Sequence, residues 1–227
     1  MKILGIETSG SIFSLCRFED WRLLYQVQKD RTLEPDRRDA RWFNELEKLL
    51  SDPVLGQMDI AAVDIGPGMF TSLRIGLSLA KALTLARGIP LVGVTSLDAM
   101  GKAAASCGRP VLAVINANQG EVYAARYEDG RRRGKCMLTT PRALAAGLRN
   151  RTLVIGPGVE IMRTIRRSRT CPWDLDDDPA WWPTASSVVR AAWPRIRRRS
   201  FDAPDYLEPF YVKRTDAERH QRARDDI

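Results

Sequence analysis

Hydrophobic and polar positions along the chain predict short strands and amphipathic helices in a regular order. In the first half, short apolar or alternating runs are typical of strands, and apolar residues at helical spacing separate them. The expected strands are residues 2–7, 12–18, 22–28, 59–65 and 91–94. The expected helices are residues 38–50, 71–87 and 97–105, the last of them capped by Ser96. The almost continuous apolar run from Asp59 to Ile65 predicts a central strand that is covered on both faces.

The second half of the sequence follows the same order. Strands are expected at residues 111–115, 121–127, 135–138 and 152–155, and helices at residues 141–148, after Gly158 and at residues 184–193. Identical Ile-Gly-Pro-Gly tetrapeptides begin at Ile65 and Ile155, and each ends a short strand and precedes a helix. This repeat predicts a duplicated βββαβα unit in two lobes, residues 1–105 and 106–227. Residues 170–183 are expected to be an irregular acidic loop, and residues 203–214 an extended tail.

Length and composition fit a globular protein. The chain has 227 residues, 44% of them hydrophobic, which suffices for one large domain or two small lobes. The longest apolar runs, such as residues 60–63 and 91–94, are far shorter than a membrane span. The first residues lack the pattern of a secretory signal, so we expect a soluble, cytoplasmic protein with no membrane contact.

The charged residues and the few possible metal ligands limit which partners and cofactors are expected. The formal net charge is +8, with arginine clusters at residues 131–133, 163–169 and 195–199. Such clusters can attract phosphates, but no aromatic residues alternate with them as in a base-stacking surface. A solubilising surface is the favoured interpretation, and weak auxiliary contact with RNA is the alternative. With four cysteines, none in Cys-x-x-Cys spacing, and one histidine, we expect no metal site and no cofactor.

Two turns carry the candidate binding residues. Glu7, Thr8 and Ser9 follow the first strand, and Gly66 and Gly68 flank a proline after the fourth. Both turns can bind a phosphate, because strand ends and helix starts offer free N–H groups and hydroxyls. Equally, the first can be a Ser/Thr turn that satisfies its own backbone, and the second a tight strand-to-helix turn. A nucleophile paired with a base is not evident, since the one histidine lies in a charged tail.

The helix expected at residues 71–87 carries more than one apolar stripe. Ser72, Gly76 and Ala80 form a smooth row of small residues, and Leu73 and Leu77 lie beside it. One stripe can pack on the chain's own sheet, but several stripes favour contact with a second subunit as well. The candidate interface residues are Trp42, Leu46, Ser72, Leu73, Gly76, Leu77 and Ala80.

The same segment resembles a known family. Residues 65–77, Ile-Gly-Pro-Gly-Met-Phe-Thr-Ser-Leu-Arg-Ile-Gly-Leu, are similar to the signature of the TsaB (YeaZ) family, commonly Gly-Pro-Gly-Ser-Phe-Thr-Gly-Leu-Arg-Ile-Gly. Residues 88–97 and the opening residues 6–9 also fit, and the resemblance extends more loosely over the whole chain. Met69 and Ser72 depart from the signature, replacing its usual serine and glycine.

This resemblance implies a fold, a role and partners. It implies the actin/Hsp70/sugar-kinase (ASKHA) fold in two lobes, with residues Glu7, Thr8, Ser9, Gly66 and Gly68 as a vestigial phosphate loop. It implies a non-catalytic accessory subunit for tRNA threonylcarbamoyladenosine synthesis, bound to a TsaD-like transferase and joined by a TsaE-like ATPase. The catalytic relative carries a His-x-x-x-His motif, which a chain with only His220 cannot supply. The candidate interface helices can also form a homodimer. The alternative is a small-molecule kinase or ATPase of the same fold.

Overall fold

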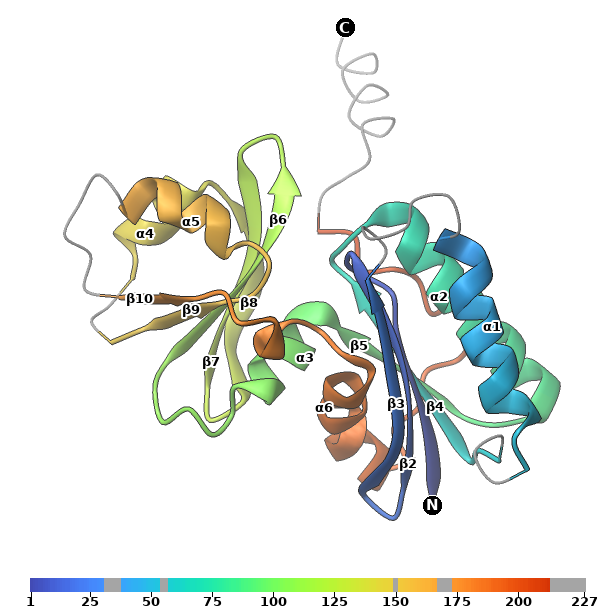
Figure 1. The fold of residues 1–227 in the computed structure, drawn as a ribbon. Helices are drawn as coiled ribbons and strands as arrows, with labels where there is room; N and C mark the ends of the chain where they lie inside the picture. Colours follow the sequence, from blue (N-terminus) through green and yellow to red (C-terminus); the bar gives the residue numbers. More distant parts are fainter. Residues whose placement is uncertain (31–37, 54–56, 149–150, 167–172, 213–227) are drawn as a thin grey trace, which may run out of the picture.

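The fold consists of two sheets with helices on both faces of each (Figure 1). A computed structural model describes residues 1–30, 38–53, 57–148, 151–166 and 173–212. The first sheet contains β1 (Lys2–Glu7), β2 (Ile12–Glu19), β3 (Arg22–Asp30), β4 (Ile60–Gly66) and β5 (Leu91–Thr95). The second contains β6 (Val111–Asn118), β7 (Glu121–Glu128), β8 (Arg131–Thr139), β9 (Leu153–Ile155) and β10 (Asp174–Asp176). The helices are α1 (Arg38–Ser51), α2 (Phe70–Arg87), α3 (Ser96–Ala103), α4 (Pro141–Ala146), α5 (Val159–Arg166) and α6 (Ala185–Arg197).

Both sheets have the same strand order and directions. In the first sheet, β3-β2-β1-β4-β5, strand β1 pairs antiparallel with β2 and parallel with β4. In the second, β8-β7-β6-β9-β10, strand β6 pairs antiparallel with β7 and parallel with β9. Each sheet is therefore built on one βββαβα unit, which confirms the duplication expected from the repeated tetrapeptide and the ASKHA-like fold that the family resemblance implies.

Three local predictions are wrong. The segment 173–183 is not irregular throughout, because β10 pairs parallel with β9 and a 3-10 helix, η2 (Pro179–Trp181), follows it. Thr95, not Ser96, caps α3, since its side chain accepts a hydrogen bond from the Asp98 backbone N–H. The described part of the tail contains a turn at residues 204–206 and is not fully extended. Residues 170–172 and 213–214 of these predictions lie outside the described residues.

Helices α3 and α6 are exchanged between the two sheets. Helix α3 follows the first sheet in the sequence, yet Leu97 and Met100 pack on the second sheet with Tyr127. Helix α6 follows the second sheet, yet Val188 and Val189 pack on the first. The division of the chain into residues 1–105 and 106–227 stays a prediction, and each of these segments carries a helix that covers the other segment's sheet.

The outer faces are covered by the remaining helices. Helices α1 and α2 lie on the outer face of the first sheet, and α4 and α5 on that of the second (Figure 1). The described residues contain no helix that is both long and apolar enough for a membrane span. Helix α2 ends at Gly88, which adopts the left-handed conformation that suits a C-terminal glycine.

Helix α2 approaches β1 closely through its small residues. Ser72, Gly76 and Ala80 are buried. A Cβ atom on Gly76 would lie 2.2 Å from the Thr8 Oγ1 atom, so only glycine fits without movement. Thr8 Oγ1 itself donates a hydrogen bond of 2.8 Å to the Ser72 carbonyl oxygen. The row of small residues is therefore a contact between α2 and its own sheet.

We expect Gly76→Leu to destabilise the fold. An added isobutyl group would displace Thr8 and the end of β1, and such overpacking typically costs about 1–3 kcal/mol. The melting temperature should then fall by several degrees, since each kcal/mol corresponds to about 2–4 °C in a chain of this size. The matched control is Ser78→Leu, an exposed position on the same helix. Equal melting temperatures for Gly76→Leu and the wild type would contradict the close contact.

Candidate functional site

The two candidate loops meet at the carboxyl ends of β1 and β4. These strands are parallel neighbours, so the residues that follow them emerge at one edge of the sheet. The Met69 backbone N–H donates a hydrogen bond of 2.7 Å to the Ser9 carbonyl oxygen. A Cβ atom on Gly68 would lie 2.4 Å from the same oxygen, so the glycine lets the loops touch. The structure thus brings together the residues predicted as a phosphate loop: Glu7, Thr8, Ser9, Gly66 and Gly68.

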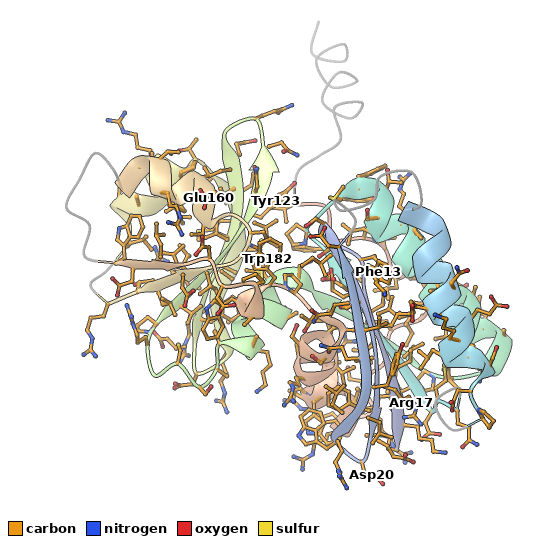
Figure 2. All side chains as sticks on the ribbon, in the orientation of Figure 1. Phe13, Arg17, Asp20, Tyr123, Glu160 and Trp182 are labelled. Carbon is orange, nitrogen blue, oxygen red and sulfur yellow. The ribbon has the colours of Figure 1, made fainter. Side chains whose placement is uncertain are left out.

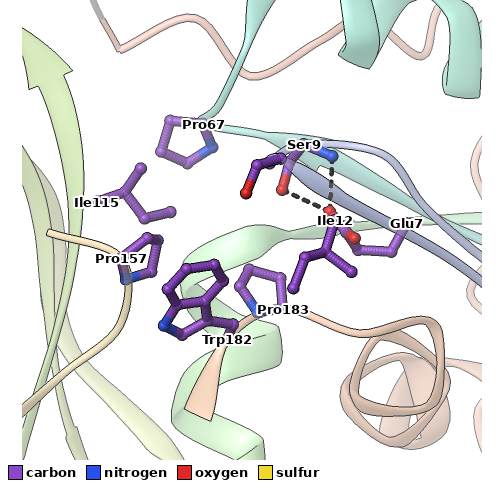
Figure 3. A pocket seen from close by; sticks show the side chains of 10 residues that line it. Glu7, Ser9, Ile12, Pro67, Ile115, Pro157, Trp182 and Pro183 are labelled. Carbon is purple, nitrogen blue, oxygen red and sulfur yellow. Dashed lines mark hydrogen bonds between the residues drawn. The ribbon is translucent and has the colours of Figure 1, made fainter. Parts of the chain in front are cut away.

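Two buried carboxyl groups hold these loops. Glu7 Oε1 accepts hydrogen bonds from the backbone N–H and the hydroxyl of Ser9, both 2.6 Å (Figure 3). Asp64 Oδ1 accepts from the Gly66 backbone N–H at 2.6 Å and from the Ser96 hydroxyl at 2.7 Å. Both acids are buried, with Glu7 1% and Asp64 0% exposed. Each carboxylate therefore fixes the backbone two residues after it, as in a ligand-free turn.

Burial raises the pKa of Asp64 to about 7 from its ordinary value of 3.8. Hydrogen bonds from Gly66, Ser96 and Ser9 oppose this rise, and the charge of Asp98 adds to it. The Ser9 hydroxyl interacts with both acidic side chains, Glu7 and Asp64. Near neutral pH the site can therefore take up or release a proton. Among the described residues no cluster of three or more histidine, cysteine or acidic side chains could hold a metal ion.

A small pocket lies between the loops and the second sheet. Its volume is about 40 Å³, which is room for a water molecule or two, whereas small-molecule sites typically measure about 300–1,000 Å³. Pro67 and Pro157, one from each Ile-Gly-Pro-Gly repeat, line it from opposite sides (Figure 3). Trp182 and Ile115 line it from the second half of the chain (Figures 2 and 3). This pocket is too small for a nucleotide.

Sequence comparison places the chain in a family. The family profile described as "TsaD: tRNA N6-adenosine threonylcarbamoyltransferase" matches residues 45–165, more than half of the chain. TsaB, the "tRNA threonylcarbamoyladenosine biosynthesis protein" of Escherichia coli K12, is 33% identical over 132 residues, which cover 56% of this chain and 55% of TsaB. The chain belongs to this family, and to its TsaB (YeaZ) group.

Another curated relative and a solved structure also match the chain. An uncharacterised protein of Mycobacterium leprae is 46% identical over 74 residues, 33% of this chain and 20% of that protein. The matches thus span only about a fifth to just over half of these curated relatives. The solved structure of YeaZ from Pseudomonas aeruginosa superposes with a TM-score of 0.76 at 22% identity, covering 93% of this chain and 99% of YeaZ. That agreement shows that the fold is the one found in YeaZ.

The predicted interface residues of this TsaB-group chain are buried within it. Ser72, Leu73, Gly76, Leu77 and Ala80 form the inner face of α2, and Leu46 of α1 is only 6% exposed. The side chain of Trp42 lies outside the described residues. These inner side chains contact their own sheet.

The sequence analysis missed Asp64 and Ser96. Asp64 is the one charged residue in the apolar run of residues 60–65, and such an isolated acid in a buried strand was a usable signal. The role of Ser96 depends on the pairing of β4 with β5, which brings its hydroxyl to Asp64 from a distant part of the chain.

We expect Asp64→Asn to remove one pH-dependent contribution to stability. The folded chain binds a proton at Asp64 more tightly than the unfolded chain, because its pKa rises from 3.8 to about 7. This contribution is fully present below about pH 4 and is lost as pH rises through about 7. The asparagine amide cannot titrate, and its oxygen can still accept from Gly66 and Ser96. Between about pH 5 and 8, the wild-type melting temperature should therefore fall relative to that of Asp64→Asn. Parallel melting profiles would show that Asp64 does not titrate in this range.

Proposed function

We propose that this protein is a non-catalytic accessory subunit in the synthesis of threonylcarbamoyladenosine in tRNA, where it binds and positions a TsaD-like transferase. The curated relatives in E. coli and Haemophilus influenzae carry the name of this biosynthesis, which supports the pathway. The observation that carries the subunit role is the exposed side of α2, where small residues and Leu85 face away from the chain's own sheet.

The exposed side of α2 carries a stripe of small and apolar residues. Ser78 and Ala82 are exposed, and Leu85 is 64% exposed. Their spacing places these three residues on the side of the helix opposite the buried row, whereas the half-buried Ile75 and Leu79 flank the stripe and pack against the chain's own core. Small residues in the middle of the stripe let a partner helix approach closely, while Leu85 supplies apolar area. A stripe of this kind is an expected docking surface for a helix of another subunit.

An aromatic and arginine cluster adjoins the amino-terminal end of this stripe. The ring centroids of Phe70 and Tyr211 lie 5.6 Å apart. The Arg74 guanidinium carbon lies 3.9 Å from the centre of the Phe70 ring, and its Nε donates a hydrogen bond of 3.2 Å to the Tyr211 hydroxyl. Phe70 and Tyr211 are 43% and 41% exposed. Exposed aromatic residues and arginines are enriched at protein interfaces, so the cluster extends the proposed contact.

Further partners follow from the same proposal. We propose that a TsaE-like ATPase joins the complex, and that the outer face of α2 also allows a homodimer when the transferase is absent. Contact with tRNA is weak or indirect in this scheme, and the complex works in the cytoplasm.

The rival function is a small-molecule kinase or ATPase of the same fold. The buried pair of Glu7 and Asp64 at adjacent strand ends is the feature that favours it, because acids at that place can bind a metal–nucleotide complex. Against it, the pocket beside Glu7 has a volume of about 40 Å³ and is lined by Trp182 and Ile115. Hydrogen bonds from Ser9, Gly66 and Ser96 already engage one oxygen of each acid.

We expect Ala82→Arg to abolish binding of the transferase without changing the fold. The arginine would place bulk and charge in the centre of the outer stripe, whereas Ala82 is exposed in the free chain. Affinity for the TsaD-like protein of the same organism should fall at least tenfold, which corresponds to about 1.4 kcal/mol. Calorimetric titration of the two purified proteins measures this, with thermal melting as the check on folding.

The matched control is Ala146→Arg, the same exchange at an exposed position of α4 on the second sheet. It should bind the transferase as the wild type does. Gly76→Leu should behave in the opposite way to Ala82→Arg: its melting temperature should fall, while its outer stripe is unchanged. If Ala82→Arg binds the transferase as tightly as the wild type does, the proposed interface is wrong. If both arginine variants lose affinity for the transferase, the cause is a general effect of charge.

We expect the purified protein to release no phosphate from ATP above a heat-treated control. The reason is the lack of space beside Glu7 and Asp64. A steady-state assay with Mg-ATP measures this directly. Phosphate release that Glu7→Gln abolishes, in a variant with an unchanged circular dichroism spectrum, would favour the rival function.

A further inference from the structure

A second aromatic and basic surface lies where α6 meets the turn between β2 and β3, the turn marked by Asp20 in Figure 2. Trp21 of this turn stacks on Trp193 of α6, with ring centroids 4.2 Å apart and planes inclined by 33°. On its other side Trp21 lies 5.9 Å from the ring of Phe18. Contacts across the fold thus hold the two indoles in a fixed position.

A hollow opens beside this stack. It has a volume of about 340 Å³ and is lined by Trp193, Pro194, Arg197 and Arg198. This volume falls within the range of small-molecule sites, which is about 300–1,000 Å³. The hollow therefore combines one aromatic ring, one apolar wall and two guanidinium groups at a size that admits a nucleobase.

The arginines of the hollow have no acidic partners among the residues that the structure describes. Their neighbour Arg195 does, since it forms two hydrogen bonds with the Asp202 carboxylate, of 3.0 and 2.8 Å. No such ion pair engages Arg197 or Arg198 in the described part of the chain, and both are exposed. These two exposed guanidinium groups are therefore available to pair with a ligand that brings negative charge.

We propose that this hollow, which we call the Trp193 site, binds single-stranded RNA. One base would lie against the Trp193 indole, and the flanking phosphates would pair with Arg197 and Arg198. Guanidinium groups match phosphate oxygens with paired hydrogen bonds, and aromatic rings bind bases of any sequence by stacking. An acidic peptide would satisfy the arginines but not the indole, so RNA fits the whole surface better. The choice of tRNA as the RNA rests on the proposed function, whereas the site itself does not.

This inference departs from one step of the sequence analysis. There no aromatic residues alternated with the arginine clusters, so a solubilising surface was favoured for all of them. The fold brings Trp21, which is distant in sequence, onto Trp193, which lies just before the last of these clusters. The cluster at residues 131–133 has no stacked aromatic pair beside it among the described residues, and keeps the solubilising interpretation.

The test measures binding of the full-length protein to unmodified tRNA and to a labelled oligouridine across a series of salt concentrations. In Arg197→Ser/Arg198→Ser, affinity should fall at least tenfold. The slope of log affinity against log salt should fall by about 1.4, because each phosphate contact on a single strand contributes about 0.7. Both positions are exposed, so the melting temperature should not change.

The matched control is Arg131→Ser/Arg142→Ser, which removes the same charge at exposed positions elsewhere. It should weaken binding less than threefold. A third variant, Trp193→Leu, keeps apolar packing and should weaken binding about tenfold without changing the salt slope, as loss of stacking requires. If this variant melts at a lower temperature, the two arginine variants alone decide the question.

Several outcomes would overturn the proposal. If Arg197→Ser/Arg198→Ser and Arg131→Ser/Arg142→Ser lose the same amount of RNA affinity, the protein is attracted to polyanions in general. If polyglutamate competes for the site as well as RNA does, the ligand is an acidic protein partner. Lack of measurable RNA binding by the wild type would also refute it. Titration with the transferase separates this result from the subunit role, because Arg197→Ser/Arg198→Ser should leave that affinity unchanged. Loss of transferase binding in Ala82→Arg with RNA binding intact would show that the two surfaces act independently.

Discussion

The exchange of α3 and α6 between the sheets is the contact on which the rest of the molecule depends. Each sheet buries its inner face under a helix that belongs, in sequence, to the other half. Tyr127 of β7 lies against Gly101 of α3, where an added Cβ atom would come within 2.5 Å of the ring, and its hydroxyl donates to Asp98. Neither half can complete its core without the other, so the two sheets are held at a fixed separation.

The fixed separation of the two sheets explains why little space is left between the two Gly-Pro-Gly turns. With the sheets drawn together, the two Gly-Pro-Gly turns face each other and Trp182 closes the space between them. The acids at the strand ends are buried as a result, and they bind their own loops rather than a solute. The strand ends at this place in the fold are thus part of the protein's internal packing.

The local pattern of hydrophobic and polar residues predicted most of the strands and helices, and the repeated tetrapeptide predicted that one unit occurs twice. The continuous apolar run of β4 and the helical spacing in α1 and α2 needed no knowledge of the fold. The sequence analysis missed strand β10 because two of its three residues, Asp174 and Asp176, are acidic. The segment is a strand only through its pairing with β9. The inner packing of Gly76 and the stacking of Trp21 on Trp193 were equally hidden. Both depend on which distant segment covers a residue, and hydrophobic periodicity does not report that.

The apolar stripe on α2 and the net charge of +8 act against each other in the free protein. Like charges repel copies of a chain, while an exposed apolar stripe favours association. Salt screens the repulsion over about 10 Å at 0.1 M and leaves the apolar attraction in place. Raising the ionic strength therefore has two opposite effects on this molecule. It favours contacts made through the apolar stripe on α2, and it weakens contacts made through arginine.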